Sequence, residues 1–395
     1  MKILFIANTP FELYYLSSVA CLLKVQDKNL KASLLIRQEI NNILTPEIRG
    51  IYSNIEVKSF PTLTPAFSKN PVKIVYNLFE NFRQTFQFRS YLKKHNFDYD
   101  VICISSSREF FANMMWRHVP RKIRLVAFRM ATQKVESEMK FRKRPVLSFI
   151  FNLKNFIFCY SRMEYKFRLD WNNVAEKNFI NYPYQCTILI TDWDIGPNHD
   201  KTIYRLPPPF IALKSIYKIK DSIPSILIAG EPTPIHPSWS AENQNKYEEF
   251  LSYLRDNFKE YKLYFKPRMV FKNAGNEILT DVNAYNLKGF EIIPAENSFE
   301  EVCLTRNIKK VISIISTASK VGVYFGISSY LLYPLFRESE FGSSHSKVYF
   351  DSYFDDMNSI VRVNKFEDIM TTPKLFMEEY NFDALSSLYW EAIIK

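Results

Sequence analysis

Short apolar runs alternate with amphipathic segments through the first part of the chain. A continuous apolar run indicates a buried strand, and apolar positions that recur every three or four residues indicate a helix. On this basis strands are predicted at residues 2–7, 32–37, 55–60, 99–105 and 123–128, and helices at 10–24, 72–95 and 110–117. Buried strands that alternate with helices predict a parallel sheet with helices on both faces.

The same alternation starts again near residue 220. Strands are predicted at 225–229, 261–265, 310–315 and 346–350, and helices at 246–257, at 298–304 and just after 316. The segment Asp192–Pro209 between the two series contains Gly196-Pro197 and three consecutive prolines, which predicts an interdomain linker. We therefore expect two doubly wound α/β domains, at residues 1–205 and 220–375, followed by a C-terminal helix at 376–395.

The composition is that of a globular protein, with 47% hydrophobic and 24% charged residues in a chain of 395. Its five cysteines are scattered, without a CxxC pair or a Cys/His spacing that suggests zinc, so we expect reduced thiols in a cytoplasmic protein. The apolar run at the N-terminus is broken by Asn8 and Pro10, which favours a strand over a signal peptide. The sequence contains no uncharged apolar stretch long enough to span a membrane.

Positive charge is concentrated in one part of the chain, whose formal net charge is +11. Ten Lys or Arg residues lie between positions 117 and 144, against two glutamates, and an aromatic-rich segment follows from 147 to 162. Two interpretations stay open: a solvated basic face, or a patch that binds an anionic membrane surface at the inner face of the cytoplasmic membrane. Nucleic acid is less favoured, because no nucleic-acid-binding motif accompanies the charge.

Two doubly wound sheets predict a cleft at the carboxyl ends of the strands, where ligands of open α/β sheets bind. The first loop at such an end is Asn8–Glu12. Thr9 is expected to cap the next helix, with Pro10 at the first helical position. The alternative is that Glu12 faces the cleft as a carboxylate on the acceptor side.

The loop after the first strand of the second domain runs from Gly230 to Pro237. Gly230 lets the backbone turn sharply and approach a ligand, and three prolines stiffen the loop. His236 is either a catalytic or ligand-contacting residue or an ordinary exposed loop histidine.

Two further strand ends carry groups suited to an anion. Lys266 and Arg268 follow one strand, and the planar guanidinium of Arg matches a phosphate group. A strand-to-helix turn carries the hydroxyls of Ser316, Thr317 and Ser319, which form an anion site with the helix dipole or serve as a simple helix cap.

Glu300 opens a predicted helix together with Glu296 and Glu301, in a place where carboxylates are favoured in any case. A contact from one of them to the ribose or base of a nucleotide is the alternative. The chain has no Walker loop, no GxGxxG motif and no strand-end carboxylate pair for a metal-bound nucleotide sugar. Asp192-Trp193-Asp194 has the sequence of such a carboxylate pair but lies in the predicted linker, so no metal is expected.

Taken in order, these loops resemble the bacterial lipooligosaccharide sialyltransferases, glycosyltransferase family 52, which are related to the bacterial polysialyltransferases. The resemblance extends over nearly the whole chain as an order of short motifs, which are Thr9-Pro10-Phe11-Glu12-Leu13, Asp100–Ser105, Gly230-Glu231-Pro232, Pro267-Arg268, Phe299-Glu300-Glu301 and Ser316-Thr317-Ala318-Ser319. It implies a GT-B fold, in which two Rossmann-like domains face a central cleft. It also implies CMP-sialic acid as the donor, no required metal, and a serine-rich turn that holds the CMP phosphate.

Three positions depart from the pattern of this family. Its acidic motif would fall on Arg129-Met130-Ala131, its general-base aspartate on Thr233 and its general-acid histidine on Arg268. Arg268 can neutralise a leaving phosphate but cannot donate a proton. The candidates for the general base are His236, which is favoured, Glu231 and Glu12.

The sequence therefore predicts an inverting glycosyltransferase that transfers sialic acid, or a related nonulosonate, from a CMP-activated donor to a glycan acceptor of a capsule or lipooligosaccharide. Two alternatives stay open. The same fold could use a UDP- or GDP-hexose, or the chain could be a non-catalytic nucleotide-sugar-binding subunit of an assembly.

Overall fold

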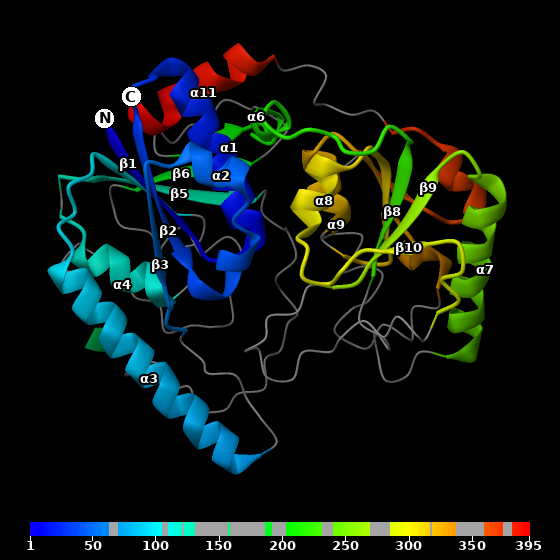
Figure 1. Ribbon diagram of the computed structural model, residues 1–395, viewed down its shortest axis with the longest axis horizontal. Helices are drawn as coiled ribbons and strands as arrows, with labels where there is room; N and C mark the ends of the chain where they lie inside the picture. Colours follow the sequence, from blue (N-terminus) through cyan, green and yellow to red (C-terminus); the bar gives the residue numbers. More distant parts are fainter. Residues whose placement is uncertain are drawn as a thin grey trace. The chain divides into compact units, whose positions relative to one another are not determined.

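The computed structural model describes residues 1–62, 70–104, 110–120, 122–130, 157–158, 186–191, 203–230, 240–268, 285–316, 318–336, 359–373 and 381–395. The chain divides into two compact units. Unit 1 comprises Met1–Ala212, Lys272–Asn276 and Phe382–Lys395, and unit 2 comprises Leu213–Phe271 and Glu277–Asn381. The division between Ala212 and Leu213 falls in the gap left between the two predicted domains. Figure 1 shows the elements of each unit in sequence colours.

The described strands of unit 1 form one seven-stranded parallel sheet in the order β3-β2-β1-β4-β5-β6-β7. Its first six positions have the strand order of the Rossmann fold, in which the chain moves outward from β1 and then returns to start again beside it at β4. The strands are β1 (Lys2–Ala7), β2 (Lys31–Arg37), β3 (Asn54–Lys58), β4 (Val101–Ile104), β5 (Arg124–Met130), β6 (Cys186–Thr191) and β7 (Ile203–Leu206).

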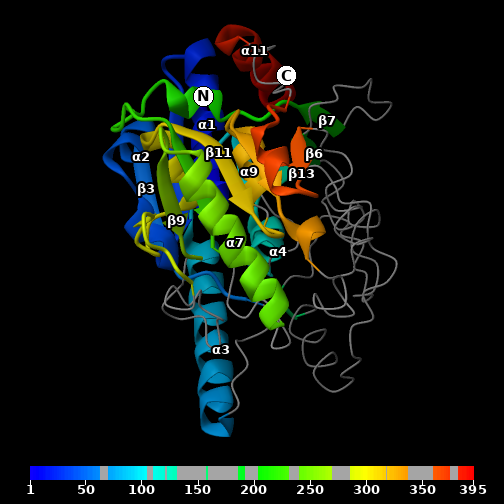
Figure 2. The ribbon, with the colours of Figure 1, turned by 90° about the vertical axis from the view of Figure 1, so that its right-hand side faces the viewer.

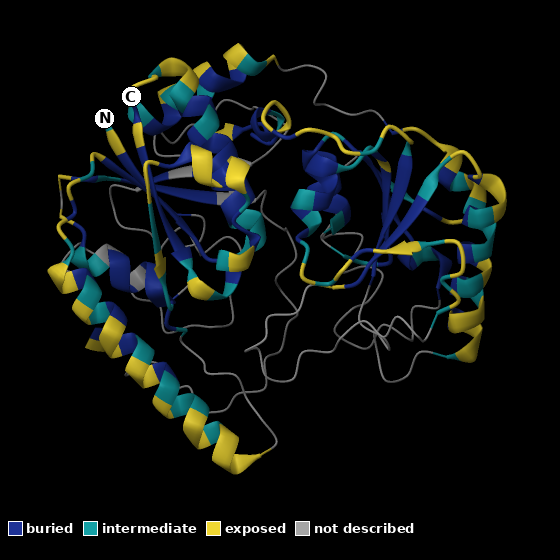
Figure 3. Ribbon diagram, viewed as in Figure 1, coloured by how far each residue is buried: buried dark blue, intermediate teal, exposed yellow. Residues whose placement is uncertain are grey.

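Helices pack on this sheet because its central strands are apolar on both faces, and Figure 3 shows these strands as buried. The helices of unit 1 are α1 (Pro10–Gln26), α2 (Pro46–Ile51), α3 (Pro71–Lys94), α4 (Phe110–His118) and the C-terminal α11 (Phe382–Ile394). The last of these lies beside α1, where the Tyr15 and Tyr389 hydroxyls are 3.1 Å apart and Ser386 Oγ donates to the Leu22 carbonyl at 2.7 Å. The end of the chain is therefore part of the first unit.

Aromatic side chains fill the core between the unit 1 sheet and helices α3 and α4. Phe60 and Phe111 stack with ring centroids 4.3 Å apart, and Phe88 of α3 lies edge-on to Phe111 at 6.5 Å. Only one face of α3 takes part, because the buried positions Asn81, Thr85, Phe88 and Leu92 recur every three or four residues.

The described strands of unit 2 form a six-stranded parallel sheet in the order β10-β9-β8-β11-β12-β13, again the Rossmann order. They are β8 (Ser225–Ala229), β9 (Lys262–Lys266), β10 (Glu291–Ile292), β11 (Ile308–Ser313), β12 (Ser328–Leu331) and β13 (Ile360–Arg362). Helix α7 (Ala241–Asn257) lies across one face of this sheet, and α8 (Phe299–Thr305) and α9 (Ala318–Tyr324) lie on the other (Figures 1 and 2).

The predicted fold class, α/β with two Rossmann-like parallel sheets, is confirmed. The predicted linker is wrong in part, because Ile203–Leu206 of the segment 192–209 is strand β7, which pairs with β6 at the sheet edge. Strands β6, β10, β12 and β13 were also not predicted, and the predicted strand at 346–350 lies outside the described residues. None of the described helices is both long and apolar enough to cross a membrane.

Candidate nucleotide site

The strand order of unit 2 has a topological switch point between β8 and β11, because α7 and α9 follow these neighbouring strands on opposite faces of the sheet. In open α/β sheets, ligands bind at the carboxyl ends of the strands at such a point. Gly230 directly follows β8, and the turn Ser313–Ser316 ends β11. Lys266 ends β9, the next strand on the β8 side. The topology therefore gathers three of the predicted strand-end segments at one edge of one sheet.

Gly230 is a glycine because β9 passes close to it. Its N–H donates to the Lys266 carbonyl at 2.7 Å. A Cβ at this position would lie 2.9 Å from the Phe265 ring and 3.0 Å from the Lys266 carbonyl oxygen. Close packing against β9 thus accounts for the glycine, and its predicted contact with a ligand stays a prediction.

Lys266 is almost completely buried, with 4% of its surface exposed. Its Nζ donates to the Pro267 carbonyl at 2.9 Å and to the Ala295 carbonyl at 3.4 Å, two of the three bonds that an ammonium can donate. Burial lowers the pKa of Lys266 to about 8, against the opposing effect of Glu300 and Glu296. The charged form of Lys266 therefore costs free energy at this strand end, because the ammonium is removed from water.

Glu300 is the second residue of α8, which is capped by Ser298 through a 3.0 Å bond from the Glu301 N–H to Ser298 Oγ. The Glu300 side chain is 6% exposed, and burial raises its pKa to about 7, while its own backbone N–H and Lys266 act in the opposite direction. A buried acid and a buried base whose pKa values approach each other from both sides are typical of a functional site. Near neutral pH Glu300 can accept a hydrogen bond or donate one.

Arg268 lies two residues beyond Lys266, and its side chain is exposed. Its predicted contact with a phosphate remains a prediction.

The serine turn after β11 is tied together by its own hydroxyls. Ser316 N–H donates to Ser313 Oγ at 3.2 Å, and Ser316 Oγ accepts from the Ala318 N–H at 3.2 Å. Ser319 is completely buried, lies 2.7 Å from Ser313 Oγ, and donates to the Tyr330 carbonyl at 3.0 Å. The Ser319 hydroxyl is thus used inside the protein and holds the turn, whereas Ser316 is partly exposed, and the predicted phosphate contact of these serines stays a prediction.

Gly322 brings α9 close to the sheet. A Cβ there would lie 2.5 Å from Ser329 Oγ and 3.2 Å from Val311 Cβ. In Rossmann folds a glycine in the helix after the ligand-binding turn commonly allows such close helix–strand packing. Gly322 thus fixes where α9 begins relative to the carboxyl end of β11.

In unit 1, the equivalent strand end carries Glu12. Its Oε2 accepts from the Asn8 N–H at 2.6 Å and from the Thr9 N–H at 3.2 Å, while Thr9 Oγ1 accepts from the Glu12 N–H at 3.2 Å. This capping box confirms the predicted cap at Thr9 and the position of Pro10. It gives Glu12 a structural use, and the role of Glu12 as a base stays a prediction.

Sequence reasoning missed two charged residues beside this cap. Arg37, at the end of β2, donates to Asn8 Oδ1 at 3.3 Å and forms a 2.9 Å ion pair with Glu39. Both side chains are largely buried. The sequence signal that could have found them is Arg37 at the end of an apolar strand, with Glu39 two residues later.

Three predicted site residues, Glu231, His236 and Thr317, lie outside the described residues, as does most of the basic stretch from 117 to 162. Within the described part of the chain, no group of three or more His, Cys, Asp or Glu side chains could hold a metal ion.

No model of a known protein family matches the sequence, and no curated protein is significantly similar to it. Solved structures with a similar chain path include TcCGT1 in complex with UDP, with 11% identity and a TM-score of 0.49 over 100% of this chain and 90% of that one. Arabidopsis thaliana UGT89C1 complexed with quercetin has 14% identity and a TM-score of 0.47, over 99% and 94% of the two chains. The E. coli ADP-heptose lipopolysaccharide heptosyltransferase II has 11% identity and a TM-score of 0.38, over 100% of this chain and 99% of that one. At these values the likeness adds nothing to what the strand order already establishes.

Proposed function

We propose that the protein is a glycosyltransferase of the GT-B class, and that unit 2 binds the nucleotide of a nucleotide-sugar donor at the carboxyl edge of its sheet. The observation that carries the proposal is the buried pair Lys266 and Glu300, beside the β8–β11 switch point and the serine turn. Buried ionisable groups with strongly shifted pKa values cluster at functional sites, which favours a ligand site here.

Each group has a role suited to its chemistry. Arg268 and the Ser316 turn bind the phosphate, and Lys266 adds positive charge behind them. Glu300 binds a ribose hydroxyl, because a carboxyl group with a pKa near 7 can act as acceptor or donor to a diol.

In the reaction, the acceptor hydroxyl attacks the anomeric carbon of the donor sugar, and its proton passes to a base. The bond from that carbon to the phosphate oxygen breaks, and the nucleotide leaves with the electron pair. Positive charge at the phosphate stabilises the negative charge that develops there. The base is taken from the predicted candidates His236, Glu231 and Glu12, with His236 favoured.

For the donor we favour a CMP-activated sialic acid or related nonulosonate, on the order of motifs along the chain. The runner-up is a UDP- or GDP-hexose, which the substituted family positions Thr233 and Arg268 favour. Calorimetric titration of the full chain with CMP, UDP and GDP distinguishes these donors. Saturable binding of none of the three would contradict the proposal, and binding without donor hydrolysis in single-turnover assays would indicate a non-catalytic subunit.

We propose in addition that the acceptor is reached at an anionic membrane surface, through α3. Large apolar side chains recur every three or four residues on the side of α3 away from the core and are 37–74% exposed; they are Val72, Val75, Tyr76, Phe79, Phe82 and Phe86. Figure 3 shows exposed residues at intervals along the whole of this helix. The helix carries five Lys or Arg residues and only one acid, Glu80. Aromatic residues beside cations are typical of helices that lie in a membrane interface.

Cosedimentation with vesicles tests this attachment. The full chain is expected to bind phosphatidylglycerol vesicles more strongly than phosphatidylcholine vesicles, and more weakly as salt rises. Replacing Phe79 and Phe86 by Ser should remove most of the binding, whereas Met370→Ser, at an exposed apolar residue of unit 2, should not. Binding that is unaffected by the Phe79/Phe86 change would refute the assignment, and dimer dissociation in that variant would show that a second chain covers this face.

A further inference from the structure

A cavity lies at the amino edge of the unit 2 sheet, opposite the proposed nucleotide site. It has a volume of about 500 Å³ and is lined by residues at the amino ends of four strands: Pro224 before β8, Tyr261 before β9, Ile308–Lys310 in β11 and Ser328 in β12. Lys310, the last residue of β11 that lines the cavity, is three residues from Ser313 of the serine turn, which is roughly 10 Å at the rise of a parallel strand. The cavity is therefore distinct from the proposed nucleotide site.

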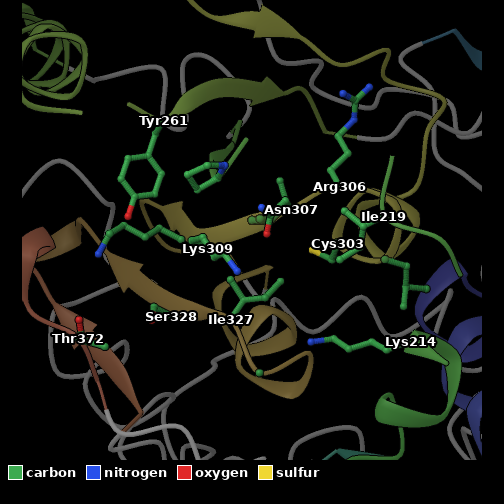
Figure 4. A pocket seen from close by; sticks show the side chains of 15 residues that line it. Lys214, Ile219, Tyr261, Cys303, Arg306, Asn307, Lys309, Ile327, Ser328 and Thr372 are labelled. Carbon is green, nitrogen blue, oxygen red and sulfur yellow. The ribbon is translucent and has the colours of Figure 1, made fainter. Parts of the chain in front are cut away.

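The lining of this cavity is strongly cationic. It includes Lys214, Arg306, Lys309 and Lys310, and it includes no Asp or Glu among the described residues. Figure 4 shows Lys214 reaching toward the middle of the cavity from one side, with Tyr261 and Thr372 on the other. Burial lowers the pKa of Lys214 although much of its side chain is exposed, and the positive charge of Lys309 acts in the same direction.

Arg306 does not contribute a free charge. Its Nη1 pairs with Asp221 Oδ2 at 3.0 Å, and its guanidinium lies over the Tyr264 ring at 4.5 Å. In Figure 4 this guanidinium points away from Lys214. Lys214, Lys309 and Lys310 are therefore the lining cations that have no ion-pair partner among the described residues.

Lys310 is the strongest indication of a ligand. Its side chain is 8% exposed, and its Nζ donates to the Tyr330 hydroxyl at 2.8 Å and to the Ile369 carbonyl at 2.9 Å. Within the described part of the chain, no carboxylate lies within 4.0 Å of this ammonium, and one of its three N–H groups is unused. A buried ammonium without a counter-charge is costly, and a bound anion would offset that cost.

We propose that this cavity binds a small molecule through a phosphate or pyrophosphate group. Ammonium groups bind phosphate as point charges, and the hydroxyls of Tyr261 and Ser328 can donate to its remaining oxygens. The volume is within the range of small-molecule sites and exceeds that of a bare phosphate, so there is room for the organic part of the ligand. The same chemistry is found in soluble phosphate esters and in phospholipid headgroups.

Calorimetric titration with inorganic pyrophosphate tests the site directly. The titration is made on the full chain in an Arg268→Ala background, so that the proposed nucleotide site contributes little. We expect saturable binding, and at least tenfold weaker binding when Lys214 and Lys309 are both replaced by Ala. The matched control replaces Lys218 and Lys220, two exposed lysines of the same segment that do not line the cavity, and should keep the affinity.

A second arm separates the two sources of the ligand. The vesicle measurement is made in the Phe79/Phe86 variant, so that α3 contributes little. If pyrophosphate does not bind, but this variant binds phosphatidylglycerol vesicles in a way that the Lys214/Lys309 change abolishes and the control does not, the ligand is a lipid headgroup. Equal affinity for pyrophosphate in the lysine variant, the control and the parent chain would overturn the proposal, as would binding of neither probe. Neither result depends on whether unit 2 binds a nucleotide, because that site is tested separately with CMP, UDP and GDP.

Discussion

Replacing Glu300 by Gln should change how the stability of the protein depends on pH. The pKa of Glu300 is raised from 4.5 to about 7, because burial disfavours the carboxylate. Between these two pH values the folded chain holds a proton at Glu300 that the unfolded chain has already lost. The free energy of unfolding therefore falls as pH rises from about 4.5 to about 7, and this contribution is lost in Glu300→Gln.

The size of the effect follows from the size of the shift. At 1.36 kcal/mol for each pH unit between the two pKa values, the wild-type chain loses up to about 3 kcal/mol over this range. The gain in the variant is smaller, about 1–3 kcal/mol, because Lys266 loses the neighbouring carboxylate that favours its charged form. The free energy of unfolding of Glu300→Gln minus that of wild type should thus be more positive at pH 7.5 than at pH 4.5.

Urea denaturation at a series of pH values measures this difference. Glu242→Gln, which removes an exposed carboxylate from the first turn of α7, is the matched control and should follow the wild-type curve. If Glu300→Gln and wild type keep the same separation from pH 4.5 to 7.5, the carboxyl group is not buried as described. A gain in stability accompanied by weaker nucleotide binding is the combination expected of a residue kept for function.

Further predictions concern the phosphate, the base and the packing of α9. Arg268→Ala should weaken CMP binding by roughly 1.5–3 kcal/mol, the value of a charge-assisted hydrogen bond, and unchanged affinity in calorimetry would exclude the contact. His236→Ala should lower turnover by ~10²–10⁴-fold with CMP affinity nearly unchanged, and a variant with normal steady-state kinetics would exclude His236 as the base. Gly322→Ala should destabilise the fold by about 1–3 kcal/mol in denaturant titrations, because the added methyl group meets Ser329 Oγ at 2.5 Å. Gly50→Ala, where nothing lies within 4 Å of the new Cβ, should be neutral or stabilising by up to about 1 kcal/mol, and equal effects at the two glycines would contradict the packing argument.

The sequence predicts those parts of the fold that are determined by a few neighbouring residues, such as an apolar run or a helix cap. The run Lys2–Ala7 is apolar on both faces and becomes the central strand β1, and the Thr9-Pro10 cap needs only residues up to Glu12. Strand β7 was missed because Ile203–Leu206 is short, lies at a sheet edge and is followed by three prolines. Its assignment depends on pairing with β6, which is not visible in its own composition.

Candidate site residues could be predicted by type and place, but their burial could not. Ser316 and Ser319 have the same side chain and lie in the same turn, yet the first is partly exposed and the second completely buried. The difference arises because Ser319 packs against β12, a strand that had not been predicted. Glu300 was similarly ambiguous, since a carboxylate in a first helical turn is normally solvated, and only the folded structure shows that burial raises its pKa.

At the two ends of β11, the geometry of the strand determines which polar side chains are exposed and which are buried. Lys309-Lys310 looks in sequence like a solvated pair at the start of a strand. Successive side chains of a strand point to opposite faces, so Lys309 is exposed and Lys310 is directed into the protein, where it meets Tyr330 and the Ile369 carbonyl and no described carboxylate. At the other end, Ser313 turns inward to hold Ser316 and Ser319. A parallel sheet thus exposes the ends of its strands at two separate edges, and in unit 2 each edge collects its own groups suited to an anion. The pyrophosphate and CMP titrations proposed above address these two edges independently, because the lysines and the serine turn share no side chain.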